Sequence, residues 1–302
     1  MPGGGATAGG GASAAYSIGP RMVPGGTRVR GLSSGFGPIA PLSTTTVPPE
    51  PRSDSTPSSV YAGLVAAHGL SDSHRLVLAA VPADARVLDV GCASGYLAQR
   101  LTARGCVVTG LEPDPRAAEA ARAHCVAVLE GDVESAQARA ALPADQDMIL
   151  FADVLEHLRD PLETLSFART VLAPGGRAII SLPNIAHWTG RRAVLRGRFP
   201  YADHGLFDRT HLRFFTRASA HALARDAGYA ITEERFTTAP LPLEGALRAR
   251  LGGDAETPAR PVAALRRTLS RRWPEMFALQ VVLTLRPAPT AAPPVAPPSA
   301  AR

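Results

Sequence analysis

The sequence predicts an α/β fold in which a mostly parallel sheet carries helices on both of its faces. Three observations support this prediction: apolar strands alternate with helical segments, the connecting turns are short, and one strand runs into a glycine turn that opens a helix. Strands joined in this way pair in parallel through right-handed crossovers. The predicted strands are residues 87–90, 106–111, 126–129, 148–151, 177–182, 229–235 and 277–285.

Residues that typically begin or end helices lie between these strands. Ser71 and Asp72 precede an apolar helical spacing, and Pro115 lies early in an alanine-rich segment. Pro174 and Gly228 each follow an amphipathic segment and end it. The predicted helices are residues 71–81, 96–104, 114–123, 161–172 and 216–227, with a short basic helix at 191–198.

The two ends of the 302-residue chain differ in composition from its middle. Residues 1–58 are rich in Gly, Pro, Ser and Thr, and residues 287–302 are mostly Pro and Ala. Neither stretch has an apolar period, so burial cannot offset the entropy of ordering it. The sequence therefore predicts a disordered leader and tail around one domain, residues 59–286. Two segments, 183–213 and 237–274, interrupt the strand–helix alternation, and we expect them to build a substrate site or its lid.

Composition limits the class of partner and the compartment. The formal charge is +6, but all 32 basic residues are Arg, which is typical of a biased bacterial genome and argues against a nucleic-acid partner. No run approaches the ~20 apolar residues of a membrane span, and the leader lacks the apolar core of a secretory signal. Cys92, Cys106 and Cys125 form no C-x-x-C pair, which indicates free thiols in a cytoplasmic protein and no cysteine-built metal site. The expectation is a protein without a metal; its oligomeric state is not fixed by these features.

The most informative motif is Asp89-x-Gly91-x-x-x-Gly95, between the first strand and its helix. Such a turn lets a ligand lie against bare backbone at a helix start. Dinucleotide-binding loops use a different glycine spacing. A carboxylate two residues before the first glycine would repel a pyrophosphate, but it suits an ammonium or sulfonium group. The loop therefore favours S-adenosylmethionine over NAD.

Acidic residues follow the next strands and complete a nucleoside site. Glu112 ends the second strand, where it can accept hydrogen bonds from ribose hydroxyls. Asp132 after the third strand can meet an adenine amino group, with Val133 against the ring, and Asp153 follows the fourth strand. The predicted cofactor-binding residues are Asp89, Gly91, Cys92, Ala93, Ser94, Gly95, Glu112, Pro113, Asp132, Val133, Ala152 and Asp153.

Taken together, five motifs resemble a known family. They are residues 87–92, Glu112 at its strand end, Gly131-Asp132, residues 154–157 and residues 172–176. In this order the chain from about residue 87 to 286 resembles class I S-adenosylmethionine-dependent methyltransferases, and is similar to ubiquinone-biosynthesis O-methyltransferases and methionine-biosynthesis protein W. The resemblance implies a Rossmann-like sheet of seven strands with the last one antiparallel, and S-adenosylmethionine as cofactor. Ala93 departs from the glycine that this family often has in the loop.

Methyl transfer to a hydroxyl needs a base, and neutral histidine titrates in the useful range. The candidates are His157, His187 and His211, with His204 beside them; His157 is expected to open the helix after the fourth strand. Trp188, Tyr201 and Arg213 are the predicted substrate residues. Together with Arg191, Arg196 and Arg209, Arg213 would recognise a carboxylate or phosphate, because Arg pairs bidentately with such groups.

The favoured function is O-methylation of a small sugar-like, acidic or secondary-metabolite acceptor. One alternative is a cofactor-binding partner module without its own turnover, which the similarity to methionine-biosynthesis protein W suggests. A nucleic-acid base methyltransferase is disfavoured because residues 152–155 read Ala-Asp-Val-Leu rather than an Asn/Asp-Pro-Pro-Tyr-type motif. An NAD-dependent oxidoreductase is disfavoured by Asp89 and by the glycine spacing.

Overall fold

The computed structural model describes residues 63, 65–67, 69–242, 244 and 260–289. All of them fall within the unit formed by residues 51–302. The predicted leader 1–58, most of the predicted tail, and residues 243 and 245–259 of the second interrupting segment lie outside this described part.

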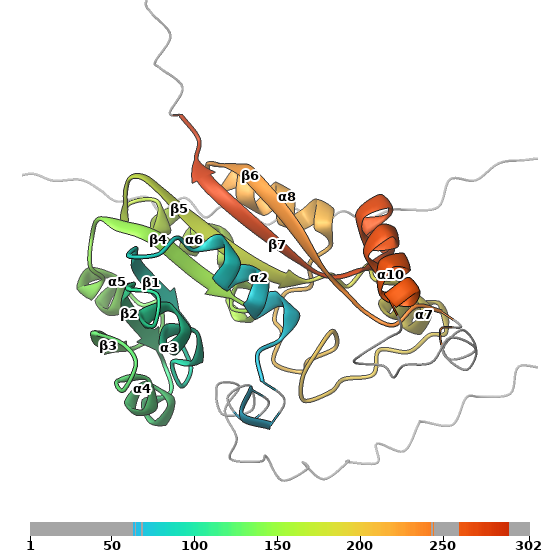
Figure 1. Cartoon of the computed structure of the whole chain (residues 1–302), viewed down its shortest axis with the longest axis horizontal. Coiled ribbons are helices and arrows are strands. Elements are labelled where there is room, and N and C mark those ends of the chain that lie inside the picture. The colour runs from blue at the N-terminus through green and yellow to red at the C-terminus, as the bar shows by residue number, and fades with distance from the viewer. Residues whose placement is uncertain (1–62, 64, 68, 243, 245–259, 290–302) are drawn as a thin grey trace, which may run out of the picture. The chain divides into compact units, whose positions relative to one another are not determined.

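A seven-stranded sheet organises the described residues, in the order β3-β2-β1-β4-β5-β7-β6 (Figure 1). The first five strands pair in parallel, and β7 lies antiparallel between β5 and β6. The predicted mostly parallel sheet with an antiparallel last strand is confirmed. The strands are β1 Arg86–Val90, β2 Val107–Glu112, β3 Ala127–Glu130, β4 Gln146–Ala152, β5 Leu172–Pro183, β6 Tyr229–Thr238 and β7 Ala278–Pro287.

Side-chain caps start most of the helices. Ser71 accepts from the His74 amide, and Asp114 accepts from the amides of Arg116 and Ala117. The basic helix begins three residues earlier than predicted, with His187 as its cap. Three helices, at residues 136–141, 260–272 and 274–277, were not predicted from the sequence. The elements are α2 Asp72–Ala80, α3 Tyr96–Thr102, α4 Pro115–Ala121, α5 Ala136–Ala141, η1 Leu155–His157, α6 Pro161–Ala168, α7 Trp188–Leu195, α8 Arg217–Asp226, α10 Arg260–Arg272 and α11 Pro274–Phe277.

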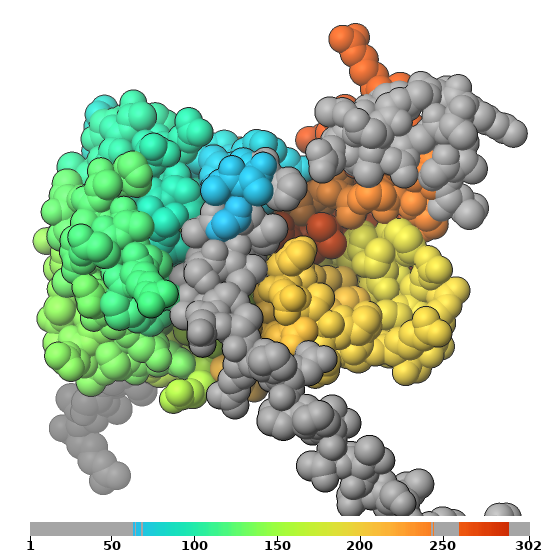
Figure 2. Space-filling model, turned by 90° about the horizontal axis from the view of Figure 1, so that it is seen from below, coloured from blue at the N-terminus to red at the C-terminus, as the bar shows by residue number. Residues whose placement is uncertain are grey.

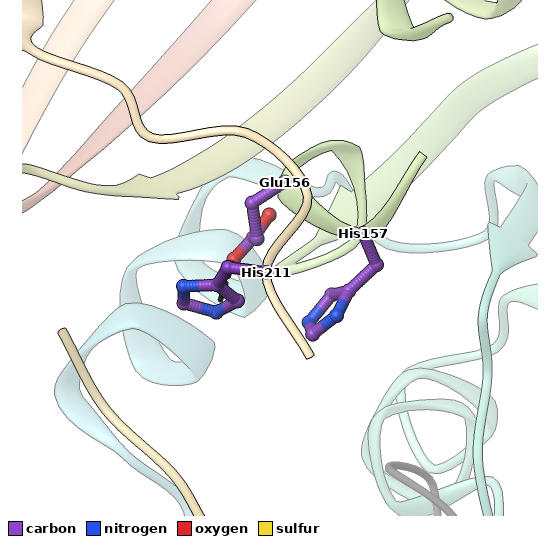
Figure 3. A group of neighbouring side chains, drawn as sticks. All are labelled: Glu156, His157 and His211. Carbon is purple, nitrogen blue, oxygen red and sulfur yellow. Dashed lines mark ion pairs between the residues drawn. The ribbon is translucent and has the colours of Figure 1, made fainter. Parts of the chain in front are cut away.

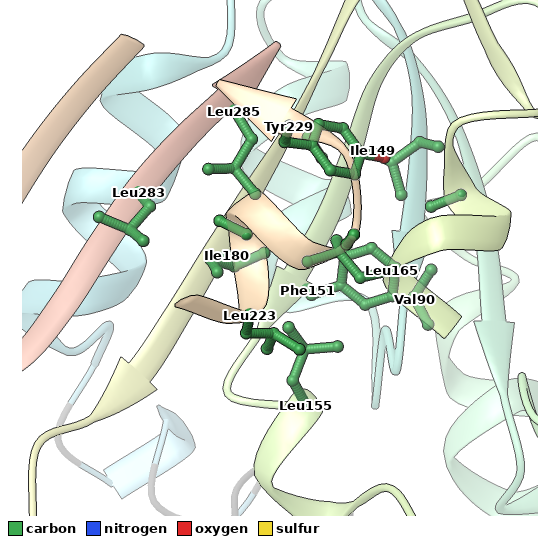
Figure 4. Close-up of a cluster of buried hydrophobic side chains, with 14 of the residues drawn as sticks. Val90, Ile149, Phe151, Leu155, Leu165, Ile180, Leu223, Tyr229, Leu283 and Leu285 are labelled. Carbon is green, nitrogen blue, oxygen red and sulfur yellow. The ribbon is translucent and has the colours of Figure 1, made fainter. Parts of the chain in front are cut away.

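The sheet is buried on both faces because its strands are apolar at successive positions. Val90 and Phe151 point to one face, where Leu165 of α6 and Leu223 of α8 cover them (Figure 4). The intervening strand residues belong to a second cluster, which α2 and α3 cover. This packing fixes the strand register, because a slip of one residue would exchange the two faces.

The register brings the carboxyl ends of the central strands to one edge of the sheet. Val90 of β1 is level with Leu111 of β2 on one side and with Phe151 of β4 on the other. The chain leaves β1 toward β2 and returns on the opposite side as β4, so a crevice opens above β1. No helix among the described residues is long and apolar enough to cross a membrane.

Candidate functional site

A cavity of about 1190 Å³ lies at this edge of the sheet and is called here the cofactor cavity. The loops after β1, β2, β3 and β4 all contribute to its wall. Nine of the twelve predicted cofactor residues line it: Gly91, Ala93, Ser94, Glu112, Pro113, Asp132, Val133, Ala152 and Asp153. The sequence therefore located the cavity, although Asp89, Cys92 and Gly95 are not among its lining residues.

The loop after β1 needs left-handed backbone at three positions, with φ of 69° at Gly91, 48° at Ala93 and 77° at Gly95. A Cβ at Gly91 would lie 2.8 Å from Val154 Cγ2, and one at Gly95 would lie 3.0 Å from Ala121 Cα. Gly95 thus serves the close packing of the loop rather than the cavity wall. Ala93 is the one residue of the three that carries a side chain in this conformation.

Replacing Ala93 with glycine should relieve this backbone strain. A left-handed conformation costs an L-residue roughly 1–2 kcal/mol, so we expect Ala93→Gly to raise the free energy of unfolding by about 1 kcal/mol. Urea denaturation of both proteins measures the difference. Ala222→Gly, inside α8, is the matched control and should lower stability by about 1 kcal/mol. Equal losses in both variants would contradict the strain at Ala93.

Glu112 connects two of these loops. Its carboxylate accepts from the backbone N–H groups of Ala93 and Asp114, both at 2.9 Å, and its side chain is buried. Glu112 also lines the cofactor cavity. This position is compatible with the predicted contact to ribose hydroxyls, which stays a prediction.

Asp89 is a predicted cofactor contact, but it is not among the residues that line the cofactor cavity. It is 1% exposed and neither oxygen has a hydrogen-bond partner among the described residues. Burial and the nearby Glu112 raise the pKa of Asp89 to about 7. A buried, unpartnered carboxylate close to Glu112, which lines the cavity, favours a positive charge nearby.

Cys92 also points away from the cavity. It is buried, and its pKa is raised by the hydrogen bond with Cys125 and by burial, so its thiol stays protonated. The side chain belongs to the packing beneath the loop rather than to a ligand contact.

The charges of the cavity wall fit S-adenosylmethionine better than a dinucleotide. The wall contains more acidic than basic residues. The acidic ones are Glu112, Asp114, Asp132, Glu134 and Asp153, and the arginines are Arg116 and Arg159. Such a wall attracts a sulfonium and an ammonium group and disfavours a pyrophosphate. Together with the unpartnered Asp89 carboxylate, this lining matches the cofactor that the loop spacing predicted.

A second cavity of about 330 Å³ meets the cofactor cavity at His74 and Asp153, which line both. The segment 183–213 contributes Pro183 and residues 204–206 to its wall, as expected. Figure 2 shows the yellow residues of this segment on the same face as the green residues from earlier in the chain. The described residues of segment 237–274 line neither cavity, so the expected contribution from that segment is not found among them.

Asp153 is held firmly at the junction of the two cavities. Its backbone is left-handed, with φ of 57°. Oδ1 accepts from Ser181 Oγ at 2.7 Å and Gln280 Nε2 at 3.0 Å, and Oδ2 accepts from Ser73 Oγ at 3.3 Å. Elements far apart in the chain therefore converge on one carboxylate and fix its direction.

His74 is a site residue that the sequence reading missed. It lies on α2, and Nε2 is 4.0 Å from Asp153 Oδ2 and 3.4 Å from the Tyr96 hydroxyl. The Ser71 N–H donates to Nδ1, so the ring proton lies on Nε2, toward Asp153. Burial lowers the pKa of His74 and keeps the ring neutral. Its position after Ser71 indicated only a helix cap.

The three predicted catalytic histidines have different surroundings. His157 lines the cofactor cavity, but it ends η1 instead of opening a helix as predicted. His211 lies beside it, with ring centroids 4.9 Å apart. His187 caps α7, contacts Thr189 and lines neither cavity. Burial lowers the pKa values of all three, to about 4 for His187 and His211.

The predicted substrate residues are engaged elsewhere. Trp188 Nε1 donates to the Pro240 carbonyl at 3.2 Å, and Arg213 donates to the Arg159 carbonyl at 2.6 Å. Tyr201 is 63% exposed and contacts Phe199. None of the three lines either of the two cavities described above, and neither do Arg191, Arg196 and Arg209. The expectation that arginines recognise an acidic acceptor at this site is therefore not supported by their positions.

Comparison with known proteins agrees with this geometry. A ubiquinone biosynthesis O-methyltransferase from Aeromonas salmonicida is 36% identical over 106 residues, which cover 33% of this chain and 43% of that protein. The one from Stutzerimonas stutzeri is 28% identical over 160 residues, 49% of this chain and 66% of that protein. The chain thus spans about half the length of the curated relatives it matches.

The fold has a counterpart among solved structures. A SAM-dependent methyltransferase from Thermotoga maritima, described as a possible histamine N-methyltransferase, superposes with a TM-score of 0.51 at 21% identity, covering 76% of this chain and 95% of that one. A family model described as a methyltransferase domain matches residues 66–234, more than half of the chain. The chain therefore belongs to the methyltransferase domain family, and it has the fold of class I S-adenosylmethionine-dependent methyltransferases.

Proposed function

We propose that this enzyme methylates a hydroxyl group of a small molecule bound in the second cavity. The observation that carries the proposal is the meeting of the two cavities at His74 and Asp153. An acceptor in one cavity would thereby reach a methyl donor in the other without leaving the protein. The O-methyltransferase names of the curated relatives support oxygen as the receiving atom.

Each cofactor residue has a role that follows from its position. S-Adenosylmethionine, when bound, supplies the methyl group as a sulfonium. Glu112 would accept from the ribose hydroxyls, Asp132 would meet the adenine amino group, and Val133 would lie against the ring. Asp89 favours the positive charge through the low dielectric of the cavity floor.

The acceptor side is arranged to orient a hydroxyl group. Asp153 has a carboxylate fixed by three hydrogen bonds that can accept the hydroxyl proton, and the neutral His74 ring lies beside it with Nε2 4.0 Å away. Leu70, Leu206 and Leu279 supply apolar walls that exclude water. Holding the reacting groups in place in a dry cavity provides much of the acceleration of a transfer reaction.

The chemistry of this wall narrows the acceptor class. The described lining of the second cavity contains Asp153 and Glu156 but no arginine. An anionic acceptor would meet the Asp153 carboxylate there and no arginine to pair with. We therefore favour a neutral, partly apolar hydroxylated molecule over the acidic acceptor that the arginine-rich segment suggested.

Filling the second cavity should separate acceptor binding from cofactor binding. We expect Leu206→Trp to abolish S-adenosylhomocysteine formation on a panel of hydroxylated acceptors, while calorimetric binding of S-adenosylhomocysteine stays unchanged. Leu195→Trp, at an 86% exposed position on α7, is the matched control and should keep both properties. Full turnover by Leu206→Trp would contradict the assignment of this cavity.

The alternative of a partner module without turnover gives a different result. In that case the wild type would bind S-adenosylhomocysteine and methylate no member of the panel, and Leu206→Trp would change nothing. The free thiols of Cys92, Cys106 and Cys125 support the predicted cytoplasmic location in either case.

A further inference from the structure

Glu156, His157 and His211 form a cluster that the proposed function does not use. Glu156 and His157 lie on η1, directly after β4, and His211 comes from the loop before α8 (Figure 3). One potential ligand atom of each residue lies within 4.8 Å of those of the other two. Residues 54 positions apart in the chain thus bring a carboxylate and two imidazoles together.

Two members of the cluster have polar atoms without partners. Both Glu156 carboxylate oxygens and His211 Nε2 lack a hydrogen-bond partner among the described residues, and Glu156 is 1% exposed. His211 Nε2 lies 3.9 Å from Glu156 Oε1, too far for a hydrogen bond. A buried carboxylate left in this state is unfavourable unless a cation or a proton joins it.

The surroundings of His157 match those of a metal-binding histidine. Its Nδ1 lies 3.3 Å from the Thr210 carbonyl, which can only accept, so Nδ1 carries the proton and Nε2 is free. Thr210 Oγ1 in turn donates to Asp208 Oδ1 at 2.7 Å. Histidines that bind metals usually donate their other ring N–H to a carbonyl or carboxylate, which orients the ring.

We propose that Glu156, His157 and His211 bind a divalent transition metal ion of the Zn²⁺ type. Two imidazole nitrogens and one carboxylate oxygen are a common ligand set for such ions and leave a coordination position open. Ligand atoms around zinc lie about 3.3 Å apart, given bonds of about 2.0–2.1 Å, so small side-chain rotations would close the cluster.

The location of the cluster gives the ion a role, which rests on the proposed function. His157 lines the cofactor cavity and Glu156 lines the second cavity, so the ion would lie where the acceptor meets the donor. A cation there lowers the pKa of an acceptor hydroxyl. The hydroxyl proton would pass to Asp153 and then to solvent, leaving the oxygen ready to receive the methyl group.

Metal binding by the full chain tests the proposal. After treatment with a chelator, the wild type is titrated with Zn²⁺ by calorimetry, and Co²⁺ is added to a second sample to record its ligand-field absorption. We expect one ion per chain, with affinity reduced by at least about 100-fold in Glu156→Gln and in His211→Ala. The melting temperature of the wild type should rise with Zn²⁺, and that of the two variants should not.

His221→Ala is the matched control, because His221 also lies beside a carboxylate, 2.7 Å from Glu234, but lines neither cavity. It should bind Zn²⁺ as the wild type does. If Glu156→Gln binds Zn²⁺ equally well, or if the wild type binds none, the proposal is wrong. In the second case Glu156 holds a proton instead, and Glu156→Gln should fold normally.

Binding of S-adenosylhomocysteine, measured on the same samples, separates this proposal from the proposed function. Binding of S-adenosylhomocysteine without binding of Zn²⁺ would overturn the metal site and leave the methyltransferase function intact. If the wild type does not bind S-adenosylhomocysteine, the proposed function itself is wrong.

Discussion

Glu112→Ala is expected to weaken S-adenosylhomocysteine binding by at least about tenfold and up to several hundredfold. The variant loses the acceptor for ribose hydroxyls, and it also leaves the N–H groups of Ala93 and Asp114 without their shared carboxylate. Two loops that form the cavity wall are then released together. Isothermal calorimetry with the wild type and the variant measures the change.

Glu119→Ala is the matched control for this experiment. Glu119 lies on α4 near the same region, but it is exposed and pairs with Arg122. Its removal should leave S-adenosylhomocysteine binding unchanged. NADH serves as the control ligand, and the acidic cavity wall predicts no binding of it. An unchanged affinity in Glu112→Ala would show that the ligand lies elsewhere.

Asp89→Asn should make the ligand-free protein more stable above neutral pH. The folded state raises the pKa of Asp89 from 3.8 to about 7, so folding opposes ionisation of this carboxyl. Well below pH 3.8 the carboxyl is neutral in both states and costs no stability. As the pH rises from about 4 to 7, the unfolded chain ionises first and the wild type loses stability. A rise of about three units corresponds to about 4 kcal/mol.

Urea unfolding at pH 5 and at pH 8 checks this prediction. Asparagine cannot ionise, so the variant should lose less stability between the two values than the wild type. Asp147→Asn provides a control of opposite sign, because the hydrogen bonds from Arg86 lower the pKa of Asp147. That substitution should lower the free energy of unfolding near neutral pH, and the difference from the wild type should become smaller at acidic pH. Parallel pH profiles for Asp89→Asn and wild type would contradict the buried, unpartnered carboxylate.

The cofactor half of the site could be predicted because most of its residues lie at the carboxyl end of a strand or within two residues beyond it. In a parallel sheet the ends of neighbouring strands meet, so Gly91, Glu112, Asp132 and Asp153 had to converge once the strands were recognised. Asp89 was harder to place. It lies inside a strand that is apolar on both faces. The sequence of such a strand has no alternation of polar and apolar residues, so it does not indicate the direction of the carboxylate.

The acceptor half could not be predicted in the same way. His74 reaches Asp153 because α2 packs across the sheet, a contact that no spacing in the sequence encodes. The segment 183–213 contributes to the second cavity, but through residues other than the predicted substrate residues. Trp188, Tyr201 and Arg213 have the residue types of a binding site, whereas the wall is formed by Leu206 and its neighbours. Residue type alone did not distinguish structural contacts from cavity lining.

The insertion of β7 between β5 and β6 has a consequence for the order in which the enzyme is made. Gln280, which holds Asp153 Oδ1, lies on this last strand, 127 residues after its partner. A nascent chain that has emerged only as far as β6 already contains every residue of the cofactor wall. Its acceptor wall still lacks Leu279 and Gln280. The proposed acceptor wall is thus completed only after β7 has been synthesised, later than the wall of the cofactor cavity.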